Sequence, residues 1–199
     1  MNKNVNKKPP TRDRLMKAAH LFYNEGIRAV GIDRLLEEAD TSIMSLYRNF
    51  GSKDALVEAY LERRNQRAQE QLDFEVARRA TTPRERILAT YDVLAEVVFA
   101  DERYRGCAFI NASAEMASPD HPLTQLAIRH KDAMLERFAR DAREAGAPDP
   151  ETLAAQLLLL MDGAFVGSDM RRDPSIALQA RAAASTLLDV ALSSSAAPL

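Results

Sequence analysis

Cysteine, tryptophan and long apolar runs are scarce in this chain of 199 residues. It has one cysteine and no tryptophan. A single cysteine excludes an internal disulfide framework and suits a reducing cytoplasm. The N-terminus is polar and basic, unlike a secretory signal. No uninterrupted apolar run approaches the roughly 18 residues of a membrane-spanning helix. We therefore expect a cytoplasmic protein with no membrane partner.

The sequence also lacks the fingerprints of catalysis, cofactors and metals. It has no Gly-x-Ser-x-Gly, P-loop or dinucleotide-binding motif. The three histidines, His20, His121 and His130, do not have metal-ligand spacing. Adjacent carboxylates such as Asp101 and Glu102 are typical of a solvated surface. We expect no enzyme activity, no cofactor and no metal.

The charge of the chain is small and unevenly distributed. Apolar residues make up 46% and charged residues 28%, which is typical of a soluble globular protein. The net charge is −2, yet residues 1–70 hold 13 Lys and Arg against 10 Asp and Glu, whereas the remainder holds 14 against 19. An anionic partner would therefore meet the N-terminal third, although an ordinary solvated surface shows a bias of this size about as often.

The spacing of apolar residues predicts an all-α fold. No segment shows the period-2 alternation of a strand. Thr11 is expected to cap a first helix that ends at Gly26, and short second and third helices are expected over 32–39 and 42–50. Ser52 is expected to cap a long fourth helix. Glycines and prolines further along separate additional helices.

The stretch TSIMSLYRNF, residues 41–50, contains one arginine and no carboxylate. On a helix, Ile43, Leu46 and Phe50 share one face, which we expect to pack on the first two helices. The opposite face is small or hydrogen-bonding, as a helix-turn-helix needs on the helix that enters the major groove. A core helix or a protein-binding helix has the same pattern. The outward residues are Ser42, Met44, Ser45, Tyr47, Arg48 and Asn49.

The longer string over residues 11–61 resembles the TetR family of bacterial transcriptional repressors. Its most specific part is SLYRNFGSKDAL, residues 45–56, close to the family's TLYxHFxSKExL. The resemblance implies an N-terminal three-helix helix-turn-helix DNA-binding domain, joined by a long helix to a C-terminal helical ligand-binding and dimerisation domain. We accordingly expect a basic disordered arm over 1–9, a DNA-binding domain over 10–60, and an effector-binding and dimerisation domain over 61–199.

The resemblance assigns DNA contacts mainly to the third helix and its ends. The N-terminus of the second helix, residues 31–34, is also expected to touch the DNA backbone. Four departures bear on operator sequence and affinity: Gly31 replaces a capping Ser or Thr, Asp40 a turn glycine, Asn49 a frequent histidine and Ile43 a frequent lysine. The assigned DNA-binding residues are Arg34, Ser42, Met44, Ser45, Tyr47, Arg48, Asn49 and Lys53.

The basic arm has two interpretations. Its Lys3, Lys7 and Lys8 either add contacts to phosphates or a minor groove, or simply form a solubilising tail. The sequence does not decide between these two roles.

Two late segments, 151–169 and 175–192, are rich in leucine and alanine. Gly163 and Gly167 lie four residues apart, which permits close approach of another helix. Burial within the same chain would explain this composition. The resemblance instead implies a homodimer through these segments, whose paired recognition helices would read palindromic half-sites.

The resemblance places an effector between the long helix and the middle helices. Aromatic and methionine side chains with a few polar groups suit a small, largely apolar molecule, although each residue alone is more often plain core. Cys107 is either a small buried residue or, as in some members of the family, a thiol that senses electrophiles or oxidants. The candidate pocket residues are Phe74, Tyr91, Phe99, Cys107, Phe109, Asn111, Glu115, His130, Met134, Phe138 and Phe165.

Together, these features predict a homodimeric transcriptional repressor that a small effector releases from a palindromic DNA operator. A helical module that binds a protein partner through the same short helices is the alternative from another class. An enzyme working in the C-terminal cavity is the remaining alternative, and no catalytic constellation supports it.

Overall fold

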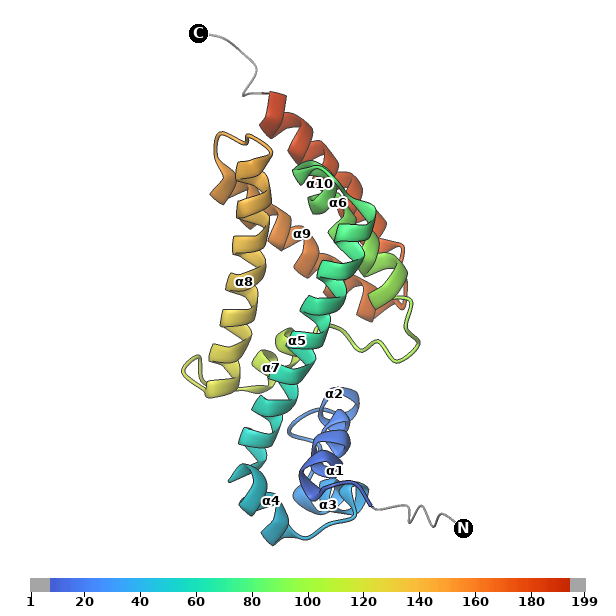
Figure 1. Cartoon of the computed structure of the whole chain (residues 1–199), viewed down its shortest axis with the longest axis vertical. Helices are drawn as coiled ribbons and strands as arrows, with labels where there is room; N and C mark the ends of the chain where they lie inside the picture. The colour runs from blue at the N-terminus through green and yellow to red at the C-terminus, as the bar shows by residue number, and fades with distance from the viewer. Residues whose placement is uncertain (1–7, 194–199) are drawn as a thin grey trace, which may run out of the picture.

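The protein is described by a computed structural model over residues 8–193, and within that range it contains helices and no strand (Figure 1). The predicted all-α fold is confirmed. Lys3 and Lys7 of the basic arm lie outside the described residues. The elements are α1 Thr11–Ala18, α2 His20–Glu25, α3 Ile32–Ala39, α4 Ile43–Phe50, α5 Lys53–Arg79, α6 Pro83–Val93, the π-helix η1 Leu94–Val98, α7 Ala108–Glu115, α8 Pro122–Glu144, α9 Pro150–Arg171 and α10 Ile176–Ser193.

The first predicted helix differs from the observed structure at two points. Thr11 is the first helical residue, and Pro10 occupies the cap position that was predicted for Thr11. The helix is also divided at Ala19 into α1 and α2. His20 Nδ1 lies 2.8 Å from the Lys17 carbonyl oxygen beside this division, and a side chain that bonds a helix carbonyl competes with the regular backbone ladder.

The turn between α3 and α4 is closed by Asp40, whose φ of 46° places it in the left-handed region. The Asp40 N–H donates to the Glu37 carbonyl and the Thr41 N–H to the Leu36 carbonyl, both at 3.1 Å, which satisfies the end of α3. Ser42 then caps α4 by accepting from the Ser45 N–H, and Ser52 caps α5 by accepting from the Ala55 N–H. Both α4 and α5 therefore begin where the sequence predicts.

The long helix α5 runs from the small N-terminal helices into the larger helical bundle (Figure 1). One apolar core contains Leu15, Leu35, Leu46 and Leu56, each 0% exposed, and extends into α7 and the start of α8. A second core lies among α6, α8, α9 and α10. Helices α1 to α4, which we call the DNA-end helices after the role that the sequence predicts for them, thus share their core with part of the larger domain.

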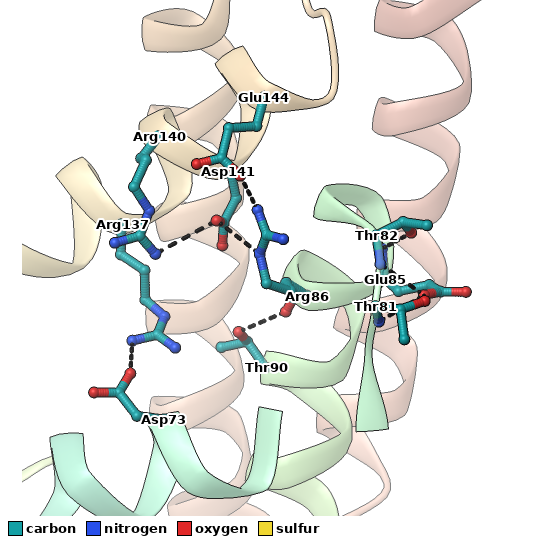
Figure 2. Close-up of polar contacts among 10 residues, drawn as sticks. All are labelled: Asp73, Thr81, Thr82, Glu85, Arg86, Thr90, Arg137, Arg140, Asp141 and Glu144. Atoms are coloured by element: carbon teal, nitrogen blue, oxygen red, sulfur yellow. Dashed lines mark hydrogen bonds and ion pairs between the residues drawn. The ribbon is translucent and has the colours of Figure 1, made fainter. Parts of the chain in front are cut away.

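A network of ion pairs fixes α6 and α5 against α8 (Figure 2). Arg86 Nε donates to Asp141 Oδ1 at 3.1 Å, and the same guanidinium pairs with Glu144. Arg137 of α8 donates to Asp73 of α5. Asp141 is only 2% exposed, so its charge depends on these partners.

Helices α9 and α10 are each buried on one face only. On α9, Leu157 and Met161 are buried, whereas Leu159 is 72% and Met170 79% exposed. Among residues 8–193, α9 alone is long and apolar enough to cross a membrane, and 33% of its most apolar 18-residue stretch is buried in the protein. By itself this says little, because a core helix of a soluble protein has the same length and composition. The open faces of α9 and α10 are large enough in apolar side chains to suggest contact with another surface.

Candidate DNA-reading helix and effector cavity

Helix α4 presents an open polar and aromatic surface. Met44 is 79% and Tyr47 48% exposed, and Arg48 is exposed beside them. Asn49 is half-buried and its amide nitrogen donates to the Ser45 carbonyl at 2.7 Å, along the helix. The face therefore offers an arginine, a phenol, a thioether and short hydroxyls, with no carboxylate on the helix itself.

The inward face of α4 is narrower than predicted. Leu46 is 0% exposed, and Phe50 is half-buried with the Arg12 guanidinium 4.8 Å from its ring centre. Ile43 was predicted to pack inward but is 46% exposed. Since Ile43 is the first residue of α4, it lies at the edge of the packed turn and adds to the open surface next to Met44.

Two predicted DNA contacts are held by protein groups in this structure. Arg34 pairs with Glu38 at 3.2 Å and with Glu25 at 3.7 Å. The Lys53 ammonium donates to the Ile27 carbonyl at 2.6 Å, and burial lowers the pKa of Lys53. Arg34 would have to exchange carboxylates for phosphates, while Lys53 retains further N–H donors.

The charge of Asp40 in the turn is neutralised by neighbouring cations. Lys8 forms an ion pair with its carboxylate, and the Arg14 guanidinium donates to the Asp40 carbonyl at 2.7 Å. The hydrogen bond from Lys8 lowers the pKa of Asp40. The Asp40 carboxylate therefore adds little net negative charge to the turn before α4.

A cavity of about 140 Å³ lies between α5, the α6–η1 helix, α7 and α8. Its lining is mostly apolar, and its few polar groups include Arg64, Thr90 and His130. His130 stacks on Phe109 with ring centres 3.9 Å apart, and its Nδ1 lies 2.7 Å from Asn65 Oδ1. Burial lowers the pKa of His130 to about 4, so its ring is neutral at pH 7. The residues named from the sequence that line this cavity are Cys107, Phe109, His130, Met134 and Phe165.

The other predicted pocket residues have different positions. Phe74 is 66% exposed on α5. Tyr91 and Phe138 stack on each other in the core, where the Tyr91 hydroxyl donates to the Leu157 carbonyl. Phe99 packs against Tyr104 and Phe165, and the remaining two, Asn111 and Glu115, bond to backbone groups outside the cavity.

The sequence interpretation missed the side of the cavity that α5 forms. Arg64, Ala68, Gln71 and Leu72 all line it. Their i, i+4, i+7, i+8 spacing places them on one helix face, and this periodicity could have revealed them. Tyr104 and Met161 were also missed, because segments distant in the chain bring them to the cavity.

Helix α7 joins this cavity to the DNA-end helices. Cys107, at its cap position, is buried in the cavity wall. At its other end, Glu115 accepts from the backbone N–H groups of Ile27 at 3.0 Å and Arg28 at 2.7 Å. Tyr23 adds a second link, donating to the Gly106 carbonyl and accepting from the Arg105 N–H. A change at the cavity wall thus has a direct contact path to the α2–α3 loop.

A helix-turn-helix pair with an open second helix, linked to a larger helical domain that holds a cavity, defines a DNA-binding transcriptional regulator. Comparison with known proteins narrows this class. Residues 15–60 match the family described as bacterial regulatory proteins, tetR family, and residues 83–184 match the tetracyclin repressor-like C-terminal domain. The chain belongs to the TetR family of transcriptional regulators, which are DNA-binding proteins and not enzymes.

Individual relatives are similar to this protein over most of its length. The HTH-type transcriptional regulator YjdC of Escherichia coli is 30% identical over 156 residues, which cover 76% of this chain and 78% of the relative. A TetR-family regulator of Streptomyces coelicolor superposes with a TM-score of 0.84 at 28% identity, over 92% of this chain and 96% of that one. A TetR-type transcriptional regulator of Streptomyces avermitilis superposes with a TM-score of 0.81 at 30% identity, over 92% of this chain and 98% of that one.

Proposed function

We propose that this protein is a cytoplasmic, nucleoid-associated homodimeric repressor that a small effector releases from a palindromic operator. The observation that carries the proposal is the open face of α4, where Met44, Tyr47 and Arg48 project from a helix without carboxylates. Arginine and hydroxyl groups on such a helix can read base edges in the major groove, while Lys53 and the helix ends meet phosphates.

The proposed dimer forms through the open faces of α9 and α10. Leu159, Gly163, Val166 and Met170 recur at helical spacing on the exposed side of α9, and Leu178 is 49% exposed on α10. Gly163 has open space where a side chain would be, so another helix can approach there. To read two half-sites of a palindrome, the α4 helices of such a two-fold dimer must lie about one DNA turn, roughly 34–36 Å, apart.

The proposed effector binds in the cavity between α5 and α8. Because α7 lines this cavity and also holds the α2–α3 loop through Glu115, a ligand that prefers a displaced α7 would change the spacing of the two α4 helices. DNA would weaken the binding of that ligand by the same factor.

Fluorescence anisotropy with DNA flanking the protein's own gene tests the DNA-binding proposal. We expect a palindrome to bind specifically, and Arg48→Ala to weaken it by roughly tenfold or more, since a base or phosphate contact contributes about 1–3 kcal/mol. Arg129→Ala is the matched control, because Arg129 is exposed on α8, away from α4. Absence of any specific site, or equal losses in both variants, would contradict the proposal.

Sedimentation of two lysine variants tests the dimer. Met170→Lys places a charge on the proposed interface and is expected to give monomers. Ile128→Lys alters a residue that is 44% exposed on α8 and should leave the dimer intact.

A reporter gene placed behind the operator distinguishes repression from activation. Loss of a repressor raises expression of the reporter, whereas loss of an activator lowers it.

A further inference from the structure

A second hollow, open to solvent and with a volume of about 650 Å³, adjoins the effector cavity. It lies between α1 and α2, the face of α5, and the segment that joins η1 to α7, which Figure 1 shows passing above α2. The two hollows share Arg64, Ala68, Gln71, Val98 and Tyr104 in their walls. The second hollow therefore lies between the effector cavity and helices α1 and α2.

The hollow is rich in cations and poor in anions, and we call it the cationic groove. Its charged side chains are Lys17, Arg63, Arg64, Arg67, Arg103 and a single carboxylate, Asp101. Asp101 is already bound by Arg103, with Nη2 3.0 Å from Oδ2. Within residues 8–193, none of the other four cations has an ion pair with a carboxylate. Arg64 is near enough to Asp101 to help lower the pKa of that carboxyl, after the larger effect of Arg103. Five cationic side chains and one carboxylate still line the groove, so it carries an excess of positive charge.

The position of these cations on α5 is unfavourable in the absence of another charge. Arg63 and Arg67 lie at i, i+4, and Arg64 and Arg67 at i, i+3, where like charges repel. Elsewhere on α5, Arg78 and Arg79 share Glu75 at 2.7 and 2.9 Å. The same helix thus pairs its arginines at one end and leaves them unpaired beside the cavity.

Arg64 connects the cationic groove to the apolar cavity. It lines both hollows, and its guanidinium carbon lies 3.8 Å from the centre of the Tyr23 ring. The cavity beyond it is lined by Leu94, Val98, Met134 and other apolar groups. Because a guanidinium remains charged at all ordinary pH values, a cation in this wall favours a ligand that brings an anion to it.

Resting on the effector function proposed above, we propose that the effector is an amphiphilic anion. Its apolar body occupies the cavity, and its carboxylate or phosphate head pairs with Arg64 and the neighbouring cations of the groove. Arginine suits either head group, because its planar N–H donors can bond two oxygens at once. Such a head would also compete with the Tyr23 ring for Arg64. Tyr23 lies on α2 and donates to the Gly106 carbonyl just before α7, so this competition would act on a contact between the two regions.

Isothermal titration with probes of equal chain length tests the charge requirement. The probes are decanoate, decyl phosphate, 1-decanol and decyltrimethylammonium, each below its micelle concentration, added to the full-length protein. We expect an anion to bind roughly tenfold or more tightly than the alcohol, as a charge-assisted hydrogen bond predicts. The tighter of the two anions identifies the head group. Equal affinity of alcohol and anions, or no binding of either anion, would overturn the inference.

Charge-neutralising variants locate the head group. Arg64→Gln should reduce the affinity of the anion by roughly tenfold and leave that of 1-decanol almost unchanged. Arg129→Gln removes the same charge from an exposed site on α8 and should change neither. Circular dichroism melting checks that both variants are folded. An unchanged anion affinity in folded Arg64→Gln would overturn the assignment of the head to this residue.

Operator binding separates this inference from the proposed function. Anisotropy with operator DNA is measured with each probe present. Release by the alcohol and the anions alike would refute the charge requirement and leave the effector function standing. Absence of specific DNA binding by the ligand-free protein would refute the proposed function itself, whatever the probes bind.

Discussion

Two clusters of arginines in this molecule have opposite surroundings. Between α6 and α8, Arg86 meets Asp141 and Glu144, and Arg140 also lies 3.4 Å from Asp141 (Figure 2). In the cationic groove, Arg64 lies on an aromatic ring, and the one carboxylate among the five cations, Asp101, pairs with Arg103. A cluster whose charges are internally balanced holds helices together, whereas an unbalanced one is suited to a charged ligand. The surroundings of a cation, more than its presence, therefore indicate its role.

The largest effect should come from breaking the balanced cluster. Asp141→Asn leaves Arg86 partly buried beside a neutral amide, and loss of one partner of a buried ion pair costs about 3 kcal/mol. Urea denaturation should show this loss as a lower midpoint with an unchanged slope. Glu144→Gln, at the exposed end of the same cluster, should cost less than about 1 kcal/mol. Similar losses of unfolding free energy in both variants would mean that the burial of Asp141 does not make its ion pair more important than that of Glu144.

The next effect concerns His130, which lies in the cavity wall and takes part in neither cluster. Because its pKa is lowered to about 4 from an ordinary 6.5, the unfolded chain binds a proton at a higher pH than the folded protein does. The free energy of unfolding should therefore fall as the pH drops from about 6.5 to about 4. Melting curves across this window should show a shallower fall for His130→Gln than for the wild type. Parallel curves would contradict a neutral, partly buried imidazole.

A third prediction concerns the contact between α7 and the α2–α3 loop, where a carboxylate bonds backbone amides instead of arginines. Glu115→Ala leaves the N–H groups of Ile27 and Arg28 without their acceptor and should cost about 1–3 kcal/mol. Hydrogen exchange at these two amides should accelerate. Glu115→Gln keeps one acceptor oxygen and should have a smaller effect. Unchanged exchange in Glu115→Ala would remove the proposed path between the cavity and the DNA end.

Local structure was predictable from the sequence wherever neighbouring residues determine it. The cap at Ser52 and a short helix over about 42–50 follow from short-range rules, and the structure confirms the cap and places α4 over Ile43–Phe50. The division at Ala19 was not predictable, because it coincides with a side-chain contact of His20. The cavity was predicted only in part, since residues as distant as Arg64 and Met161 line it together. Composition suggested aromatic liners, but packing placed Phe74 in solvent.

The smallest effect on stability should come from the unbalanced cluster. The double variant Arg63→Gln, Arg67→Gln removes two exposed charges that repel each other at i, i+4, so the free energy of unfolding should stay within about 0.5 kcal/mol of the wild type or rise slightly. Any gain should shrink as salt is added, because salt screens repulsion between exposed charges. Urea denaturation at low and high ionic strength measures both. Stability equal to wild type combined with weaker binding of a decyl anion would separate the two clusters cleanly: one set of arginines supports the fold, and the other supports the ligand. A loss of stability comparable to that of Asp141→Asn would instead show that the groove cations have structural partners and would erase the distinction.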